Sequence, residues 1–154
     1  MGLDMYLNGR RYISKYFDEQ DGDRADAIAE QFPEINGDSH LGGSKVKEVI
    51  IEAGYWRKAN AIHKWFVDHV QGGEDECKPH YVSREQLKEL RELCETVLRE
   101  RARAGELLPA ASGFFFGSTD YDDYYYDDLE TTVKIIDDCL ELPESWEFEY
   151  RSSW

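Results

Sequence analysis

The sequence has no run of about 18 apolar residues, the length that a membrane-spanning helix needs. It has few cysteines, since Cys77, Cys94 and Cys139 are the three in 154 residues, and they form no close pair. The N-terminus also lacks a basic start followed by an apolar stretch, so no signal peptide is expected. These absences predict a reduced, cytoplasmic protein without a membrane-spanning segment.

Positive charge is scarce as well. Lys and Arg together number 18 against 33 Asp and Glu, which gives a net charge of −15. Such a charge argues against direct binding of nucleic acid or of an anionic membrane. The charge is also uneven, because residues 44–64 hold five basic and two acidic side chains, whereas residues 105–150 hold thirteen acidic side chains and Lys134 alone. The sequence therefore predicts two electrically distinct faces.

What is abundant is apolar and aromatic surface. The chain is 41% hydrophobic and 14% aromatic, which is typical of a globular protein. The length predicts a single domain over residues 1–154. Residues 17–43 are polar and are broken by Gly and Pro, so they are expected to form a variable excursion loop or a short helix over residues 23–31.

Alternating side chains predict strands at both ends of the chain. Residues 2–7 alternate, and Asn8-Gly9 then predicts a type I′ hairpin into residues 10–16. Residues 146–151 alternate again and are expected to pair with this hairpin. The predicted fold class is α+β, with a small antiparallel sheet from the N-terminal hairpin and the C-terminal strand, packed against three to four helices.

Helical periodicity predicts helices over residues 44–53, 55–70, 83–103 and 119–140. The third has the clearest start, because Ser83 and Gln86 have the spacing of a capping box. The fourth carries a core stripe that includes Tyr125 and Leu129, with Thr119 and Asp122 as a capping box. Before it, Phe114, Phe115 and Phe116 lie between two glycines, which predicts a short buried strand over residues 113–117.

The second predicted helix is the best candidate for a binding site. Its spacing would place Trp56, Asn60 and His63 on one face, with cationic side chains beside them. An aromatic ring, an amide, an imidazole and several cations suit a small, anionic, nucleotide-like ligand. The segment from 114 to 126 would close this pocket. The predicted ligand-binding residues are Trp56, Arg57, Lys58, Asn60, His63, Lys64, Phe115, Tyr121 and Tyr124.

Three other interpretations stay open. In the first, Trp56 lies in the core, His63 bonds a neighbour and the cations form a solvated face. In the second, an acidic aromatic face docks on a basic, nucleic-acid-binding surface of a host protein. In the third, the protein is a small phosphoester hydrolase with His63 as acid or base. The partner-binding residues of the second interpretation are Asp122, Asp123, Tyr126, Asp127 and Asp128.

No motif predicts a cofactor, a metal ion or a catalytic residue. Cys77 and His80 have the spacing of half a zinc site, but a second ligand pair is missing. The acidic segment 18–26 lacks the alternating ligands of a calcium loop. Phosphate-binding glycine loops and hydrolase motifs are absent too.

Several long stretches resemble a known group of proteins. "MGLDMYL", "GYWRKANAIHKWFV", "YVSREQLKELRELC" and "LLPAASGFFFGSTDYDDYYYDDLE", with the closing "SSW", are similar to a family of small uncharacterised bacteriophage and bacterial proteins. The resemblance covers most of the chain, and residues 17–43 match it least. It implies a phage or mobile-element setting, and it implies no particular chemistry.

Together these observations predict a phage-type, non-enzymatic binding protein in the cytoplasm of the bacterial host. Its expected partner is the small anionic ligand described above, and sequestration of a host signal molecule in counter-defence is the expected purpose. The exposed aromatic residues are consistent with a homodimer.

Overall fold

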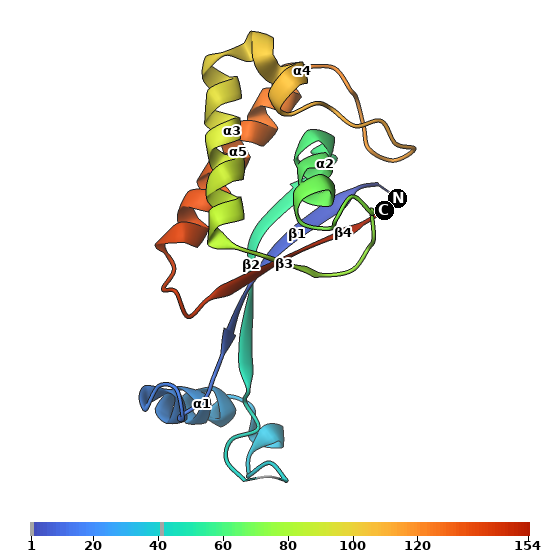
Figure 1. The fold of residues 1–154 in the computed structure, drawn as a ribbon. Helices are drawn as coiled ribbons and strands as arrows, with labels where there is room; N and C mark the ends of the chain where they lie inside the picture. The colour runs from blue at the N-terminus through green and yellow to red at the C-terminus, as the bar shows by residue number, and fades with distance from the viewer. Residues whose placement is uncertain (1, 41) are drawn as a thin grey trace. The chain divides into compact units, whose positions relative to one another are not determined.

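The computed structural model describes residues 2–40 and 42–154 and has an α+β fold. Four antiparallel strands form one sheet in the order β2-β1-β4-β3 (Figure 1). The strands are β1 (Asp4–Tyr12), β2 (Glu48–Arg57), β3 (His80–Val82) and β4 (Glu147–Ser153). The helices are α1 (Gln20–Glu30), α2 (Asn60–His69), α3 (Arg84–Arg99), α4 (Ala104–Leu107) and α5 (Asp123–Glu141), with 3-10 turns at Pro33–Ile35 and Arg101–Arg103. None of the helices in the described part of the chain is long and apolar enough to cross a membrane.

The chain divides into two compact units. The larger comprises the residues up to Gly9 together with Glu52–Trp154, and the smaller comprises Arg10–Ile51. In the smaller unit, α1 is fixed by the buried carboxylate of Asp21, which accepts hydrogen bonds from Arg11, Arg24 and the backbone N–H of Ser14. A carboxylate that is this well paired can be buried without a large penalty.

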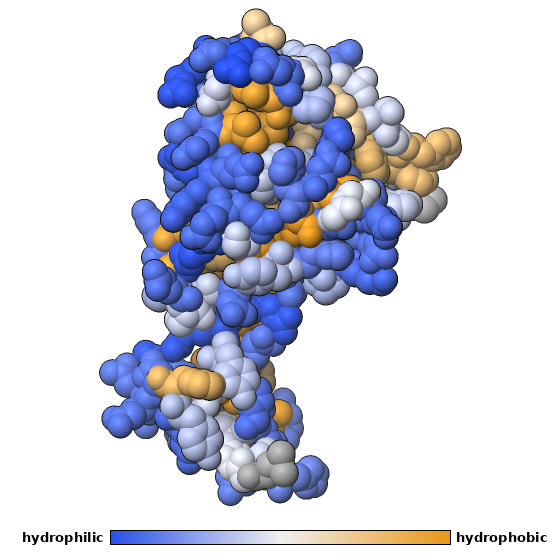
Figure 2. All heavy atoms as spheres, viewed as in Figure 1, coloured by the Kyte–Doolittle hydropathy of each residue, from blue (hydrophilic) through white to orange (hydrophobic). Residues whose placement is uncertain are grey.

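The core of the larger unit lies between one face of the sheet and the helices. On β4, buried Phe148, Tyr150 and Ser152 alternate with more exposed residues, so only one face of this strand is covered. Helices α2, α3 and α5 lie on that side of the sheet (Figure 1). Hydrophilic residues cover most of this unit on the face that Figure 2 shows, and small apolar patches lie between them.

The helices α3 and α5 confirm their predicted core stripes. Ser83 and Gln86 form the reciprocal capping box that starts α3. On α5, Tyr125 and Leu129 are buried as predicted. The capping box predicted from Thr119 and Asp122 is wrong, because the helix begins at Asp123 and Asp122 is its N-cap, accepting from the N–H of Tyr125. β4 lies beside β1, as expected for the C-terminal strand. The short helix predicted at 23–31 is α1, which begins three residues earlier.

The N-terminal hairpin prediction is wrong. β1 runs straight through Asn8 and Gly9, and neither residue has the positive φ that a type I′ turn requires. The strand beside β1 comes from residues 48–57 instead, which also overturns the helix predicted over 44–53. The β-branched run Val49-Ile50-Ile51 favours a strand, and this preference outweighs the helical spacing of the apolar residues.

Two further boundaries differ from the prediction. Residues 113–117 form a turn and not a strand, and Phe114 is 95% exposed. The glycines that flank the aromatic run there permit a turn as readily as they end a strand. The connector 73–82 contains β3, whose His80 pairs with Tyr150 of β4. Three residues are too short a run for periodicity to reveal.

Candidate functional site

The segment predicted as one helix over 55–70 is a strand followed by a helix. Trp56 and Arg57 end β2, and α2 begins only at Asn60. Between them Lys58 has a φ of 60°, in the left-handed region that residues other than glycine rarely adopt. The N–H of Lys58 donates to the carbonyl of Leu3 at 2.8 Å, and this bond holds the junction beside the start of β1. Trp56 and Asn60 therefore do not share a helical face.

Asn60 fastens the loop of residues 110–118 onto the start of α2. Its Nδ2 donates to the carbonyls of Phe116 at 3.0 Å and Ser118 at 2.8 Å. Its Oδ1 accepts from the N–H of Ala111 at 3.0 Å. The side chain is buried, and these three bonds use most of its hydrogen-bonding capacity. Asn60 therefore builds the wall of a site and is not free to contact a ligand.

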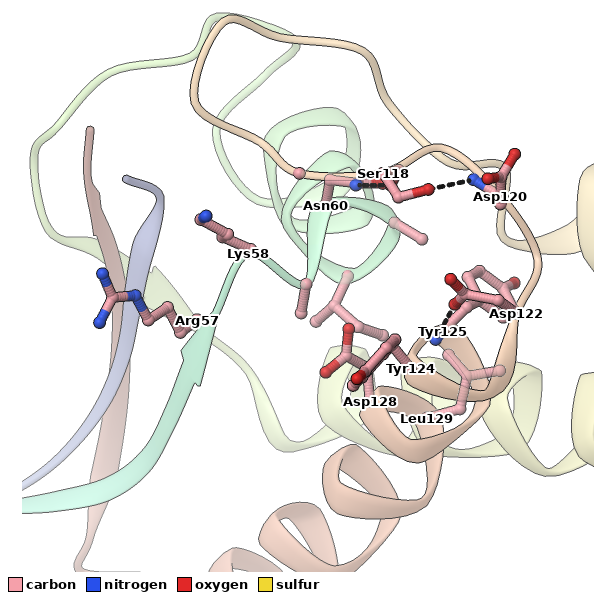
Figure 3. Close-up of a pocket in the computed structure, with 14 residues that line it drawn as sticks. Arg57, Lys58, Asn60, Ser118, Asp120, Asp122, Tyr124, Tyr125, Asp128 and Leu129 are labelled. Atoms are coloured by element: carbon pink, nitrogen blue, oxygen red, sulfur yellow. Dashed lines mark hydrogen bonds between the residues drawn. The ribbon is translucent and has the colours of Figure 1, made fainter. Parts of the chain in front are cut away.

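A pocket of about 270 Å³ lies where β2, α2, this loop and α5 meet. Figure 3 shows Tyr124, Tyr125, Asp122 and Asp128 gathered on one side, with the loop and the start of α2 across from them. Tyr124 is 80% exposed, so its ring is available for contact. The pocket is lined by Arg57, Lys58, Ala59, Asn60, Ala61, Ile62, Gly117, Ser118, Asp120, Asp122, Tyr124, Tyr125, Asp128 and Leu129.

Asp128 is the distinctive polar group in this pocket. It is half-buried on α5, and among the described residues its carboxylate makes no hydrogen bond or ion pair. Burial, together with the neighbouring carboxylates of Asp127 and Asp122, raises the pKa of Asp128 to about 6 from 3.8. The other two carboxylates that line the pocket differ from it, since Asp122 is engaged as the helix cap and Asp120 is exposed. Asp128 therefore remains as an acceptor without a donor.

The two cations of the pocket lie at its edge. Figure 3 shows the side chains of Arg57 and Lys58 extending away from Tyr124 and Asp128. The Nε of Arg57 lies 4.0 Å from a carboxylate oxygen of Asp4. The interior of the pocket is thus acidic and aromatic, and positive charge lies at its rim.

His63 lies deeper and is only 1% exposed. The hydroxyl of Tyr150 lies 2.8 Å from Nδ1, and Asp75 Oδ2 lies 3.0 Å from Nε2. In the neutral ring these contacts are both satisfied when Tyr150 donates to Nδ1 and Nε2–H donates to Asp75. Trp154 Nε1 donates to the other oxygen of Asp75 at 3.3 Å. These hydrogen bonds join α2 to the C-terminal strand. They agree with the interpretation in which His63 bonds a neighbouring residue.

A second hollow of about 380 Å³ lies on the other side of the same loop. Lys64 and His63 border it, and Phe116 lies edge-on to His63 with ring centroids 5.1 Å apart. Lys64 is paired with Asp68 at 2.6 Å. The structure therefore separates His63 and Lys64 from the pocket that Arg57, Lys58 and Tyr124 line.

The remaining predicted ligand-binding residues have structural contacts. Trp56 is buried, and its Nε1 donates to Thr132 of α5 at 2.9 Å. The carbonyl of Phe115 accepts from the N–H of Leu3 at 3.2 Å. Tyr121 packs edge-on against Tyr125, with ring centroids 4.9 Å apart. These residues support the pocket but do not line it.

The five residues of the acidic-face interpretation point in different directions. Asp122 caps α5, Tyr126 is buried beneath the guanidinium of Arg101 at 4.0 Å, and Asp128 lines the pocket. Asp123 and Asp127 are the two that lie exposed on the surface. The helical period of α5 distributes this short acidic stretch around the helix.

Sequence reasoning missed two features of the pocket. It assigned Asp128 to a docking face, although Tyr124 and Asp128 stand four residues apart and so share one helical face. It also left out Ser118 and Asp120, whose position depends on the loop that Asn60 holds. No local sequence pattern reveals hydrogen bonds between residues so far apart in the chain.

Within residues 2–40 and 42–154, no three His, Cys, Asp or Glu side chains are placed to hold a metal ion together. Cys77 is exposed, whereas Cys94 and Cys139 are buried. In comparisons with protein-family models, curated proteins and solved structures, nothing matched this chain. The functional argument therefore depends on the geometry of the pocket.

Proposed function

We propose that this protein is a non-enzymatic binding protein that holds a small, planar, nucleotide-like ligand in the pocket between α2 and α5. The main support is a convergence of distant segments. Arg57–Ile62 and Gly117–Leu129 lie some sixty residues apart in the sequence, yet they line one cavity. The first segment begins with the cations Arg57 and Lys58, and the second is rich in tyrosine and aspartate.

The lining suits a ligand with two different ends. Tyr124 offers an exposed ring on which a flat group can stack. Asp128 offers an unpaired carboxylate to a hydrogen-bond donor, and the rim cations Arg57 and Lys58 suit an anionic group. Lys58 also keeps a left-handed backbone there, a kind of strain that clusters at binding sites.

The geometry gives less support to the two rival interpretations. The ring of His63 is only 1% exposed and both of its nitrogens are bonded within the protein, which gives the hydrolase interpretation less support. Only part of the acidic docking set faces outward. The phage-type setting that the resemblance suggests would give a binding protein a use in withholding a host signal molecule.

Native mass spectrometry of the protein purified from bacterial cells tests this proposal. We expect a stoichiometric small-molecule passenger on the wild type, or a stabilised complex after a mixture of mononucleotides is added. The Tyr124→Ala variant should bind the ligand roughly five- to 150-fold more weakly and so carry less of it, because base–aromatic stacking is worth about 1–3 kcal/mol.

Tyr81→Ala is the matched control, since Tyr81 is 65% exposed on β3 and does not line the pocket. It should carry ligand like the wild type. The proposal is wrong if wild-type protein carries no passenger and no small molecule of any class raises its melting temperature. Equal occupancy in both tyrosine variants would also contradict the assignment of the site.

A further inference from the structure

We propose that the pocket selects a heterocycle with two adjacent N–H donors, the arrangement at the edge of a guanine base, through the carboxylate of Asp128. This inference rests on the proposed function and names the ligand class of the same site. It depends on the position of Asp128, on its neighbour Tyr124 and on the charges at the rim.

The first step concerns what Asp128 lacks. An ionised carboxylate only accepts hydrogen bonds, and its two oxygens can accept two parallel bonds from one planar group. Within the described part of the chain, no donor reaches these oxygens. Removing such a group partly from water is unfavourable unless a donor compensates it. A ligand with two N–H groups in one plane supplies that compensation.

The second step concerns the orientation of a flat ligand. Tyr124 precedes Asp128 by one helical turn, so both side chains emerge from the same face of α5. A ring stacked on Tyr124 would present an edge to the Asp128 carboxylate. Arg57 and Lys58 border the same pocket and suit a phosphate at the mouth.

The third step is discrimination between bases. A guanine edge carries the N1–H and N2–H donors side by side, and a hypoxanthine edge keeps N1–H alone. An adenine edge offers one donor and one acceptor, and the acceptor would face a carboxylate oxygen. A bidentate contact of this kind discriminates between bases by about 1–3 kcal/mol, which is roughly five- to 150-fold. The expected order of affinity is GMP, then IMP, then AMP.

Other charged groups near Asp128 do not replace it in this role. Asp122 is engaged as the cap of α5, and Asp127 is exposed. The carboxyl of Asp128 has a pKa of about 6 because of its burial and of these two neighbours, so it is ionised at pH 7.5. The measurement is therefore made at that pH.

Isothermal titration calorimetry with GMP, IMP and AMP tests the inference on the full chain. Wild-type protein should bind GMP about tenfold or more tightly than AMP. In the Asp128→Asn variant this preference should vanish or reverse, because a carboxamide pairs a donor and an acceptor with adenine. Asp127→Asn, which makes the same change one residue away on the exposed surface, should keep the preference for GMP.

The outcomes separate this inference from the proposed function. Equal binding of GMP and AMP, or an unchanged preference in Asp128→Asn, would overturn the guanine-type edge while leaving the pocket as a binding site. If an aliphatic diamine such as putrescine bound more tightly than GMP, the carboxylate would recognise positive charge alone, and the inference would again be overturned. If no nucleotide binds but a passenger of another class is found, only the inference fails. If neither is found, both fail.

Discussion

Single side chains in this protein divide into those that fasten the fold and those that remain available. His63, Asn60 and Trp56 looked like ligand contacts in the sequence, yet each has its polar atoms bonded to distant parts of the chain. Asp128 looked like surface charge and is instead a half-buried carboxylate without a donor in the described structure. The type of a residue predicts what it can bond, but not which partner the fold supplies.

Tyr150→Phe should destabilise the protein by about 1–3 kcal/mol, the usual cost of an unsatisfied buried polar group. The substitution keeps the ring that stacks on Phe66 with centroids 3.9 Å apart, and it removes the hydroxyl that donates to His63. Urea denaturation measures the loss. Tyr81→Phe, at an exposed ring on β3, should change the unfolding free energy by less than about 0.5 kcal/mol.

Asp128→Asn should stabilise the protein near neutral pH. The pKa of Asp128 is raised to about 6 in the folded state, so the native protein binds the proton more tightly than the unfolded chain does. Stability from this group is therefore present below about pH 4 and is lost as the pH rises through about 6. The shift corresponds to about 3 kcal/mol, and solvent screening of the half-exposed group reduces the expected gain to about 1 kcal/mol.

Thermal denaturation of both proteins between pH 4 and pH 8 checks this expectation. The difference in melting temperature should be near zero at pH 4 and should grow to a plateau above pH 7. A difference that does not change with pH would contradict the burial of Asp128. Because the same substitution should weaken the binding of GMP, stability and GMP affinity should move in opposite directions.

At the scale of elements, the ends of the helices and strands are where sequence reasoning was weakest. The long amphipathic helices α3 and α5 were predictable because a stripe repeated over four or five turns has few alternatives. The run from Ser44 to Val70 was not, because the apolar residues there have helical spacing while the β-branched run Val49-Ile50-Ile51 favours a strand. The candidate site lies where this prediction was wrong, at Lys58 between the end of β2 and the start of α2.

The loop of residues 110–118 should depend on one side chain for its position. Asn60→Ala removes two donors to the loop and the acceptor of the Ala111 N–H. We expect hydrogen exchange at the Ala111 amide to accelerate by about tenfold or more, since a net hydrogen bond is worth about 1 kcal/mol and its geometric constraint is lost too. Amides in α3, which this loop does not order, serve as the internal reference and should exchange at their wild-type rates.

At the scale of the whole molecule, the net charge of −15 is the dominant property. Repulsion among like charges destabilises a compact chain, and salt screens it with a Debye length of about 10 Å at 0.1 M. Stability should therefore rise as NaCl increases from about 10 mM to 300 mM. Urea midpoints at fixed pH measure this trend, and a fall with salt would show that attractive ion pairs outweigh the repulsion.

Composition and strand patterning predicted an α+β fold with a small antiparallel sheet, and the structure has one. The order of its strands could not be predicted from the sequence, because β1 and β2 are neighbours although 35 residues separate them in the chain. The candidate site combines the end of β2 and the start of α2 with residues 117–129, which come much later in the chain. Tyr124 was recognisable from the sequence as a pocket residue, whereas the position of Asp128 in the same pocket was not.

The most direct test of the account is a heteronuclear NMR titration of the full chain with a small panel of mononucleotides. If the pocket binds such a ligand, the amide signals that shift should come from Arg57–Ile62 and Gly117–Leu129, with saturation at a single equivalent. Signals from β3 and from Arg10–Ile51 should stay in place. No shift at millimolar ligand, or shifts confined to residues outside the two pocket segments, would contradict the proposal that this pocket is a nucleotide-binding site.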